Sequence, residues 1–360
     1  MPKGYKFQRL YKALLEILKT NNWETGDRFH SETQLCNKFD VSRQTVRKAL
    51  AQLVDEGFLI KKHGSGTFIT EKAIAKRNVK TNVIGILVTY LSDYIFPVII
   101  NQLEQQFTRA GFAVQLASSG NSTKLEGELL QKMLQNNVDG IILEPTRSAF
   151  PSPNINLYKE LTKQKYPMVT IHSNFDEVDI PTVALNDKKA GFLACEHLFK
   201  KHHQNIGAII KADDLQGHNR YKGILEAHSQ RNLIFDDKNV YWYTTEDISN
   251  FHLLEDAVLN RLENCSAVIC YNDQIAIEYE KMLLNKNFKI PEDKSIISID
   301  NSKYAELAPV PLTSVESPIK EIGIQAAKLL LQQIQGEAYP DEIILEPQLV
   351  VRKSCSNFKK

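Results

Sequence analysis

Near the N-terminus, apolar residues recur at helical spacing in two short stretches separated by a few polar residues. In the first stretch, Leu35 and Phe39 lie four residues apart and predict a helix that ends at Phe39, with Ser31 as its N-cap. In the second, Ser42 is the expected N-cap, and the buried stripe consists of Val46, Leu50, Leu53 and Val54. The pattern therefore predicts two consecutive helices joined by a tight turn.

The polar face of the second helix is unusually rich in groups that read nucleic acid. It carries Arg43, Gln44, Thr45, Arg47 and Lys48 in its first two turns. In a helix-turn-helix, this part of the second helix enters the major groove, where Arg recognises guanine and Gln recognises adenine. A solvated basic face on an ordinary amphipathic helix is the alternative, but the partner helix and short turn favour DNA binding.

A hairpin is predicted directly after these helices. Residues 58–62 and 67–69 alternate like strands around His63-Gly64-Ser65-Gly66, whose glycines permit a tight turn. Placed after a DNA-reading helix, the hairpin is interpreted as a wing with His63 and Gly64 at its tip. A glycine-rich phosphate cradle is the rival interpretation, but no GxxxxGK[ST] pattern is present and no helix follows the glycines.

The segments SETQL, VSRQTVRKAL, LVDEGFL and GSGTF resemble the winged-helix DNA-binding domain of the GntR family of bacterial regulators. The resemblance implies an α+β winged helix-turn-helix over residues 1–70, with a preceding helix at residues 8–21. It also implies that Arg43, Gln44, Thr45 and Arg47 contact DNA. Further contacts to the DNA backbone are expected from Lys3, Tyr5 and Glu32.

Beyond residue 82 the pattern changes to short apolar runs that alternate with helical stretches. Residues 71–82 are polar and basic without apolar periodicity, and are predicted to be a linker. Apolar runs such as VIGILV at 83–88 and VDGIIL at 138–143 predict buried parallel strands with helices on both faces. The number of such units up to residue 350 is too large for one sheet, so we predict a two-lobed α/β body.

Polar residues concentrate where these predicted strands end, and ligands bind at this edge of open α/β sheets. Acidic, amide and Arg side chains there suit vicinal hydroxyls, and aromatic rings suit the C–H face of a sugar. Asp187, Asp213 and Asp273 are more simply explained as helix caps or turn residues. The candidate effector-binding residues are Tyr94, Phe96, Glu144, His172, Lys211, Arg220, Trp242, Asn272 and Asp300.

The segments VALNDKKAGFLACEHL, HNRYKGILEAH, CYNDQIAI and PEDKSIISIDNS resemble the sugar-binding domain of LacI-type repressors. That domain is similar to type I periplasmic sugar-binding proteins, so the resemblance implies two lobes around an effector over residues 83–355. It assigns Arg220, Asn272 and Asp300 to the second lobe's ligand contacts. His172-Ser173 departs from the Asp-Arg that the family often has.

A GntR-type domain joined to a LacI-type domain resembles the arabinose-responsive repressors of Gram-positive bacteria. The matching segments include SDYIFP, EPTRSA and KADDLQG. This resemblance implies a repressor of sugar utilisation genes that L-arabinose releases from its operator, with Tyr94 and Glu144 as first-lobe contacts. The implied partners are palindromic double-stranded DNA, a small sugar and a second copy of the chain.

Charge and cysteine content support this division. Residues 1–80 hold 16 Lys and Arg against 8 Asp and Glu, whereas the remaining 280 residues hold 28 against 35. A basic domain attached to an acidic one suits a segment that neutralises phosphates. The five cysteines form no CxxC pair, which favours reduced thiols over a zinc site. With no apolar run of signal-peptide or membrane length, we expect a cytoplasmic protein without membrane contact, metal or cofactor.

Several alternatives stay open at this point. A glycosidase could use two of the acidic residues, but the sequence lacks GxSxG, a metal triad and GxGxxG after a strand, so we expect no enzyme. A periplasmic sugar receptor would need a signal peptide and no helix-turn-helix. The same architecture could also respond to another pentose or small polyol, or act as an activator or corepressor-dependent regulator.

Overall fold

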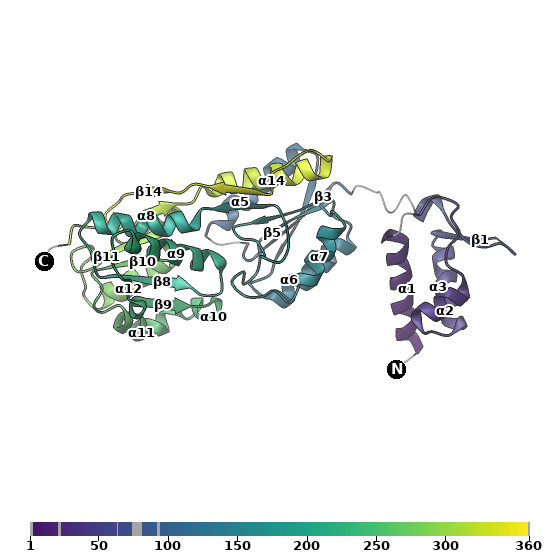
Figure 1. Cartoon of the computed structure of the whole chain (residues 1–360), viewed down its shortest axis with the longest axis horizontal. Coiled ribbons are helices and arrows are strands. Elements are labelled where there is room, and N and C mark those ends of the chain that lie inside the picture. The colour runs from purple at the N-terminus through teal and green to yellow at the C-terminus, as the bar shows by residue number, and fades with distance from the viewer. Residues whose placement is uncertain (1–2, 21–22, 63, 74–80, 92–93, 359–360) are drawn as a thin grey trace. The chain divides into compact units, whose positions relative to one another are not determined.

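The computed structural model describes residues 3–20, 23–62, 64–73, 81–91 and 94–358, apart from the side chains of residues 3–6, 19 and 20. The chain divides into two compact units, Met1–Lys80 and Thr81–Lys360, which we call the head and the body. Figure 1 shows the head in purple and the body in blue through teal to yellow. Within the described residues, no helix is both long enough and apolar enough to cross a membrane.

The head is a winged helix-turn-helix, as predicted. Its elements are α1 (Lys3–Thr20), α2 (Glu32–Phe39), α3 (Arg43–Asp55) and the antiparallel strands β1 (Leu59–Lys62) and β2 (Gly66–Ile69). The two helix starts follow from their caps, since Ser31 and Ser42 each accept a hydrogen bond from the backbone three residues on. The apolar stripes meet in one core formed by Leu10, Leu14, Leu35, Val46, Leu50, Leu53, Phe58 and Ile69.

The limits of the head and the body differ from the predicted ones by a few residues. Lys72 Nζ donates to the Glu56 carbonyl at 2.7 Å, and Ala73 is only 6% exposed within the head core. At the other side, Thr81 N donates to Asp139 Oδ1 at 2.9 Å. The predicted linker at 71–82 therefore includes residues of both units at its ends, and its middle, 74–80, lies outside the described residues. The body also continues beyond residue 355, where Phe358 N donates to the Lys201 carbonyl at 2.8 Å.

The first lobe of the body is built on a six-stranded parallel sheet with the order β13-β7-β6-β5-β3-β4. Its strands are β3 (Val83–Val88), β4 (Ala113–Ser118), β5 (Gly140–Leu143), β6 (Met168–Ile171), β7 (Thr182–Leu185) and β13 (Glu342–Leu345). Helices α5 (Phe96–Arg109) and α14 (Ile319–Gln335) lie side by side on one face, as Figure 1 shows. The other face is covered by α6 (Thr123–Gln135) and α7 (Ile155–Lys163).

The second lobe repeats this design in a sheet of order β14-β12-β11-β10-β8-β9. Its strands are β8 (Ile206–Lys211), β9 (Val240–Tyr243), β10 (Ala267–Cys270), β11 (Ser295–Asp300), β12 (Thr313–Glu316) and β14 (Gln348–Val350), of which β14 is antiparallel to β12. Helices α8 (Asp187–Lys200) and α9 (Leu215–Ser229) cover one face. The second face carries α11 (Glu255–Arg261) and α12 (Asp273–Asn285). The short helices α10 (Thr245–Ile248) and α13 (Lys303–Leu307) complete the lobe.

The chain crosses between the lobes three times, because β7, β12 and β13 are each followed by an element of the other lobe. These crossings lie at residues 186, 317–318 and 346–347. The two lobes are thus parts of one unit, and the predicted two-lobed α/β architecture is confirmed. Both sheets direct the carboxyl ends of their parallel strands toward the region between the lobes, where the candidate effector residues lie.

Candidate functional site

The first half of α3 presents the predicted DNA-reading side chains to solvent. Arg43, Gln44 and Lys48 are exposed, and Thr45 is half-buried. Ser42 fixes the start of the helix, since its hydroxyl accepts from Thr45 N at 3.3 Å and contacts Thr45 Oγ1 at 2.9 Å. The opposite face of α3 is locked into the head core, so the reading face is held rigidly while its side chains stay free to contact bases.

Arg47 and Glu32 are joined by an ion pair between α3 and α2. Arg47 Nε donates to Glu32 Oε2 at 2.9 Å, and the Arg47 side chain remains 66% exposed. Glu32 was expected to contact the DNA backbone itself. That contact stays a prediction; in the structure the Glu32 carboxylate holds the guanidinium of Arg47.

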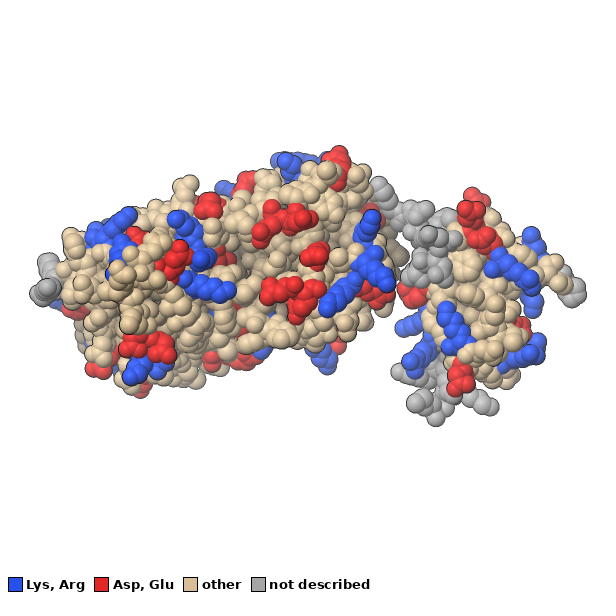
Figure 2. All heavy atoms as spheres, in the orientation of Figure 1, with Lys and Arg blue, Asp and Glu red and all other residues tan. Residues whose placement is uncertain are grey.

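The wing is short and basic. Lys61 and Lys62 are exposed on β1, and Lys62 Nζ lies 4.9 Å from the centre of the Phe68 ring. Gly64 is exposed with a φ of 73°, a conformation that favours glycine at the tip. His63 lies outside the described residues, as do the side chains of Lys3 and Tyr5 on α1. Figure 2 shows basic side chains on several parts of the visible face of the head.

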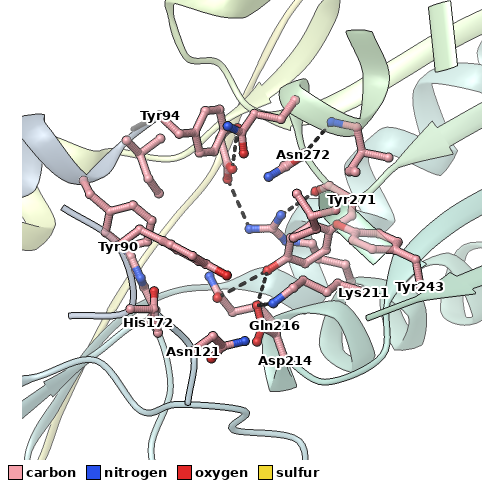
Figure 3. Close-up of a pocket in the computed structure, with 18 of the residues that line it drawn as sticks. Tyr90, Tyr94, Asn121, His172, Lys211, Asp214, Gln216, Tyr243, Tyr271 and Asn272 are labelled. Carbon is pink, nitrogen blue, oxygen red and sulfur yellow. Dashed lines mark hydrogen bonds and ion pairs between the residues drawn. The ribbon is translucent and has the colours of Figure 1, made fainter. Parts of the chain in front are cut away.

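The body contains a cavity of about 460 Å³ between its two lobes. Residues from the carboxyl ends of strands in both sheets line it, as the strand-end rule predicts. Figure 3 shows Tyr90 and His172 of the first lobe facing Lys211 and Tyr271 of the second across this space. Eight of the nine candidate effector residues lie in its wall, namely Tyr94, Phe96, Glu144, His172, Lys211, Arg220, Asn272 and Asp300.

Arg220 forms the centre of the second-lobe wall and is only 2% exposed. Its Nε donates to Asp187 Oδ1 at 2.8 Å and its Nη2 to Asp300 Oδ1 at 3.1 Å. The guanidinium also donates to the Tyr271 carbonyl and stacks on the Tyr271 ring, with 4.6 Å from Cζ to the ring centre. These contacts fix the planar group in one orientation beside the ligand space.

Close packing of α8 on α9 places Arg220. A Cβ added to Gly191 would lie 1.9 Å from the Arg220 carbonyl oxygen, and one added to Gly223 would lie 1.9 Å from the Lys188 carbonyl oxygen. Only glycine permits this approach of the two backbones. The approach brings Asp187, at the start of α8, to Arg220, which lies one turn into α9.

Glu144 and His172 form a second buried acid–base pair in the first-lobe wall. His172 Nδ1 lies 2.8 Å from Glu144 Oε1, and the other carboxylate oxygen accepts from the backbone N–H and the hydroxyl of Thr89. Burial lowers the pKa of His172, but the hydrogen bond and charge of Glu144 outweigh this effect, so the pKa lies above its ordinary value.

Lys211 provides a third pair at the far side of the cavity. Its Nζ lies 2.7 Å from Asp214 Oδ2 and 3.4 Å from Asp213 Oδ1. Burial lowers the pKa of Lys211, yet the two carboxylates raise it to above its ordinary value. The hydroxyl of Tyr271 also donates to Asp214 Oδ2, at 3.1 Å. Lys211 therefore keeps its positive charge, and the neighbouring carboxylates balance it.

Aromatic rings supply much of the remaining wall. Tyr94 donates its hydroxyl to Asp300 Oδ2 at 2.7 Å and stacks on Tyr304, with ring centres 5.9 Å apart. Tyr90 and Tyr271 also line the cavity, although neither was predicted from the sequence. The available signal was their position, since each follows closely on the carboxyl end of a strand, β3 and β10 respectively.

Trp242 was predicted in the effector site, but it does not line this cavity. Side chains alternate along β9, so Tyr243 faces the cavity while Trp242 points to the other face of the sheet. There its ring contacts His218 and Tyr221 of α9, and it remains 38% exposed. The prediction therefore chose the correct strand, β9, but named Trp242 in place of the adjacent Tyr243.

The three acidic residues interpreted as caps have different roles. Asp273 lies in the first turn of α12 and accepts hydrogen bonds from Ser298, Ser302 and Ser314, which join β11 and β12 to that helix. Asp187 pairs with Arg220, as described above. Asp213 bridges the lobes, since Asn121 Nδ2 of the first lobe donates to its Oδ2 at 3.4 Å, and Thr245 Oγ1 donates to the same oxygen at 2.7 Å.

The arrangement suits an uncharged polyol. Among the described lining residues, each cation is paired with a carboxylate: His172 with Glu144, Lys211 with Asp214, Arg220 with Asp300 and Lys281 with Glu278. Such pairs present donors and acceptors, and they leave none of these lining cations free to bind a phosphate. The described residues contain no cluster of three His, Cys, Asp or Glu side chains that could hold a metal ion.

Comparison with known proteins identifies a domain of known type in the head and another in the body. Residues 6–69 match the family of bacterial regulatory proteins called the gntR family, and residues 195–355 match a periplasmic binding protein-like domain. Two relatives named arabinose metabolism transcriptional repressor are each 35% identical to this chain. The one from Geobacillus stearothermophilus is aligned over 98% of both chains, and the one from Halalkalibacterium halodurans over 100% of this chain and 98% of its own.

Solved structures share the fold of the body. A LacI family regulator from Enterococcus faecium with bound ribose has a TM-score of 0.66 at 25% identity, covering 77% of this chain and 100% of its own. A periplasmic binding protein/LacI regulator from Alkaliphilus metalliredigens, complexed with D-xylulofuranose, has a TM-score of 0.67 at 24% identity, covering 76% and 99%. Together with the near-full-length relatives, these observations show that the chain belongs to the gntR-type arabinose metabolism transcriptional repressors.

Proposed function

We propose that this protein represses sugar utilisation genes in the cytoplasm by binding a palindromic operator, and that L-arabinose in the body cavity releases it. The observation that carries the proposal is the cavity itself, whose buried cations are each held by carboxylates around a space that suits an uncharged polyol. The near-full-length relatives named arabinose metabolism transcriptional repressors support arabinose as the sugar.

On the DNA side, the exposed face of α3 enters the major groove. Arg43 and Arg47 are the candidate base-reading residues, since Arg can donate two hydrogen bonds to guanine. Gln44, Thr45 and Lys48 add base or phosphate contacts, and the wing with Lys61 and Lys62 follows the backbone. Two heads of a homodimer then read two half-sites about one helical turn, or a multiple of it, apart.

Release follows from the position of the cavity between two lobes joined by three crossings. Tyr94 of the first lobe reaches Asp300 of the second, and Asn121 reaches Asp213, so the lobe arrangement and the cavity wall are formed by the same side chains. A sugar bound there favours one lobe arrangement, which alters the spacing of the heads. By linkage, the sugar lowers operator affinity by the factor by which operator lowers sugar affinity.

The test is a titration of the full-length protein with L-arabinose, D-ribose, D-xylose and L-arabinose 5-phosphate. Calorimetry measures the affinity for each compound, and an operator-binding assay measures its effect on DNA affinity. We expect L-arabinose to bind most tightly and to weaken operator binding, and we expect the phosphate to fail because no lining cation of the described residues is unpaired. Tight binding of the phosphate, or release by a different pentose alone, would overturn the effector assignment. Stronger operator binding with sugar would identify a corepressor.

A further inference from the structure

His172 is buried in the cavity wall with one ring nitrogen occupied and the other unsatisfied. It follows β6, is 5% exposed, and has a φ of 67°, which is rare for a residue with a side chain. Nδ1 is bonded to Glu144, whereas Nε2 has no hydrogen-bond partner among the described residues. A buried polar atom of this kind is costly unless something satisfies it.

The partner of His172 determines where its protons lie. One oxygen of the Glu144 carboxylate already accepts two hydrogen bonds from Thr89, and the other lies against Nδ1 of His172. A carboxylate can only accept from His172, so Nδ1 carries a hydrogen. The unsettled question is whether Nε2 carries one too.

The charges around the His172 ring favour a hydrogen on Nε2 as well. His172 interacts with Glu144 at the end of β5, with Asp187 at the start of α8 and with Asp300 at the end of β11. Arg220 from α9 is shared by Asp187 and Asp300, so it neutralises one of these two carboxylates. Phe96 from α5 contributes only an uncharged ring edge, 6.3 Å between centres. A neutral His172 would leave the buried Glu144 carboxylate without a counter-charge, which is strongly unfavourable.

We propose that His172 is an imidazolium whose free Nε2–H donates to an oxygen of the bound sugar, which makes effector binding depend on a proton held by the Glu144–His172 pair. This inference rests on the proposed function of the cavity as a sugar site. It assigns His172 a specific task, which is to select ligands with an acceptor oxygen opposite the end of β6.

The pH dependence has a definite sign. The pKa of His172 is raised above its ordinary value, and donation to a sugar oxygen raises it further in the complex. Sugar affinity is therefore fully present below the pKa of the free protein and weakens above it by up to about tenfold per pH unit. In that upper range, binding takes up as much as one proton per sugar.

Proton uptake can be measured on the unaltered protein. Full-length protein is titrated with L-arabinose by calorimetry between about pH 6 and about pH 9, in pairs of buffers with different ionisation enthalpies. We expect net proton uptake at the alkaline end and an apparent Kd that rises with pH there. An affinity independent of pH, with no proton uptake, overturns the inference.

Two variants separate His172 from its acidic neighbours. H172Q keeps an N–H donor near the position of Nε2 but cannot titrate, so its sugar affinity should be lower than that of the parent at about pH 6 and constant with pH. D187N removes the carboxyl whose pKa burial raises to about 6, and it should retain the alkaline slope. If H172Q keeps the slope and D187N loses it, the proton resides on Asp187 and the inference is wrong.

The outcomes also distinguish this inference from the proposed function. L-arabinose that binds without proton linkage contradicts the role of His172 alone, and the cavity remains a sugar site. No binding of L-arabinose at any pH contradicts the proposed effector, and the role of His172 falls with it. Thermal unfolding of H172Q checks that the body is intact.

Discussion

The reading face of α3 and the wall of the body cavity both concentrate Arg and other polar groups, but they hold them in opposite ways. Arg43 and Arg47 extend into solvent from a rigid helix, and Arg47 pairs with the surface residue Glu32. Arg220 is buried and fixed by Asp187, Asp300 and the Tyr271 carbonyl before any ligand arrives.

The difference reflects what each site must recognise. Operator DNA is large and charged, and solvent-exposed side chains can adjust to it, with affinity supplied by many phosphate contacts. A sugar is small and uncharged, so selectivity requires donors that are oriented in advance and cannot turn to each other or to water. We therefore expect mutations in the cavity to alter stability and sugar response together, and mutations on α3 to alter DNA binding alone.

The largest effect is expected from Arg220→Ala. The change leaves two buried carboxylates without their cation, for which the typical cost is about 3–5 kcal/mol. Thermal unfolding should show a destabilised body, and calorimetry should show no binding of L-arabinose. The matched control is Arg231→Ala, which removes a partly exposed pair with Glu196 and should change both measurements little. If L-arabinose still released the Arg220 variant from operator DNA normally, the effector would have to bind elsewhere.

An intermediate effect is expected from Arg43→Ala and Arg47→Ala. Each should weaken operator binding by about 1–3 kcal/mol, provided that it makes a two-bond contact to guanine. Sugar affinity and thermal unfolding should stay as in the parent because both side chains are exposed. Operator binding is measured by electrophoretic mobility shift. The control in that assay is Lys12→Ala, which removes an exposed cation on α1. Unchanged operator affinity in both arginine variants would refute the reading face.

A smaller effect is expected from Lys48→Ala, which removes an exposed charge in the second turn of α3. If Lys48 contacts a phosphate, the slope of log K against log salt should decrease in magnitude by about one. The preference for operator over unrelated DNA should remain. A loss of that preference with no change in slope would show that Lys48 reads a base.

The smallest effect on sugar binding is expected from removing residues 1–80. The body has its own cores and carries every described residue that lines the cavity, so the fragment should fold and bind L-arabinose with the Kd of the full chain. Calorimetry on the fragment and the full chain checks this. A fragment that is folded but binds no sugar would mean that the head contributes to the effector site.

Sequence alone predicts the head in detail because its determinants are local. Ser42 lies next to Arg43, and Arg47 follows one turn later, so residue spacing places the caps and the reading face directly. The pairing of Glu32 with Arg47 is the exception, since it depends on how α2 packs against α3. Nothing within either helix indicates that contact.

The cavity is predictable only in part because its residues come from distant segments. The strand-end rule located Lys211, His172 and Asp300, since carboxyl ends of parallel strands meet at one edge. It failed for Trp242 because the face on which a residue of a short strand lies depends on register against β8. It could not find contacts such as Asn121 with Asp213, because those depend on how three chain crossings orient the lobes.

The central claim is that the buried cavity controls the exposed reading face. The direct test measures the affinity of the full-length protein for L-arabinose with and without saturating operator DNA, and its affinity for operator with and without saturating L-arabinose. The account predicts that each ligand weakens the other by the same factor, of about 5- to 150-fold. Two affinities that are each independent of the other ligand would contradict it.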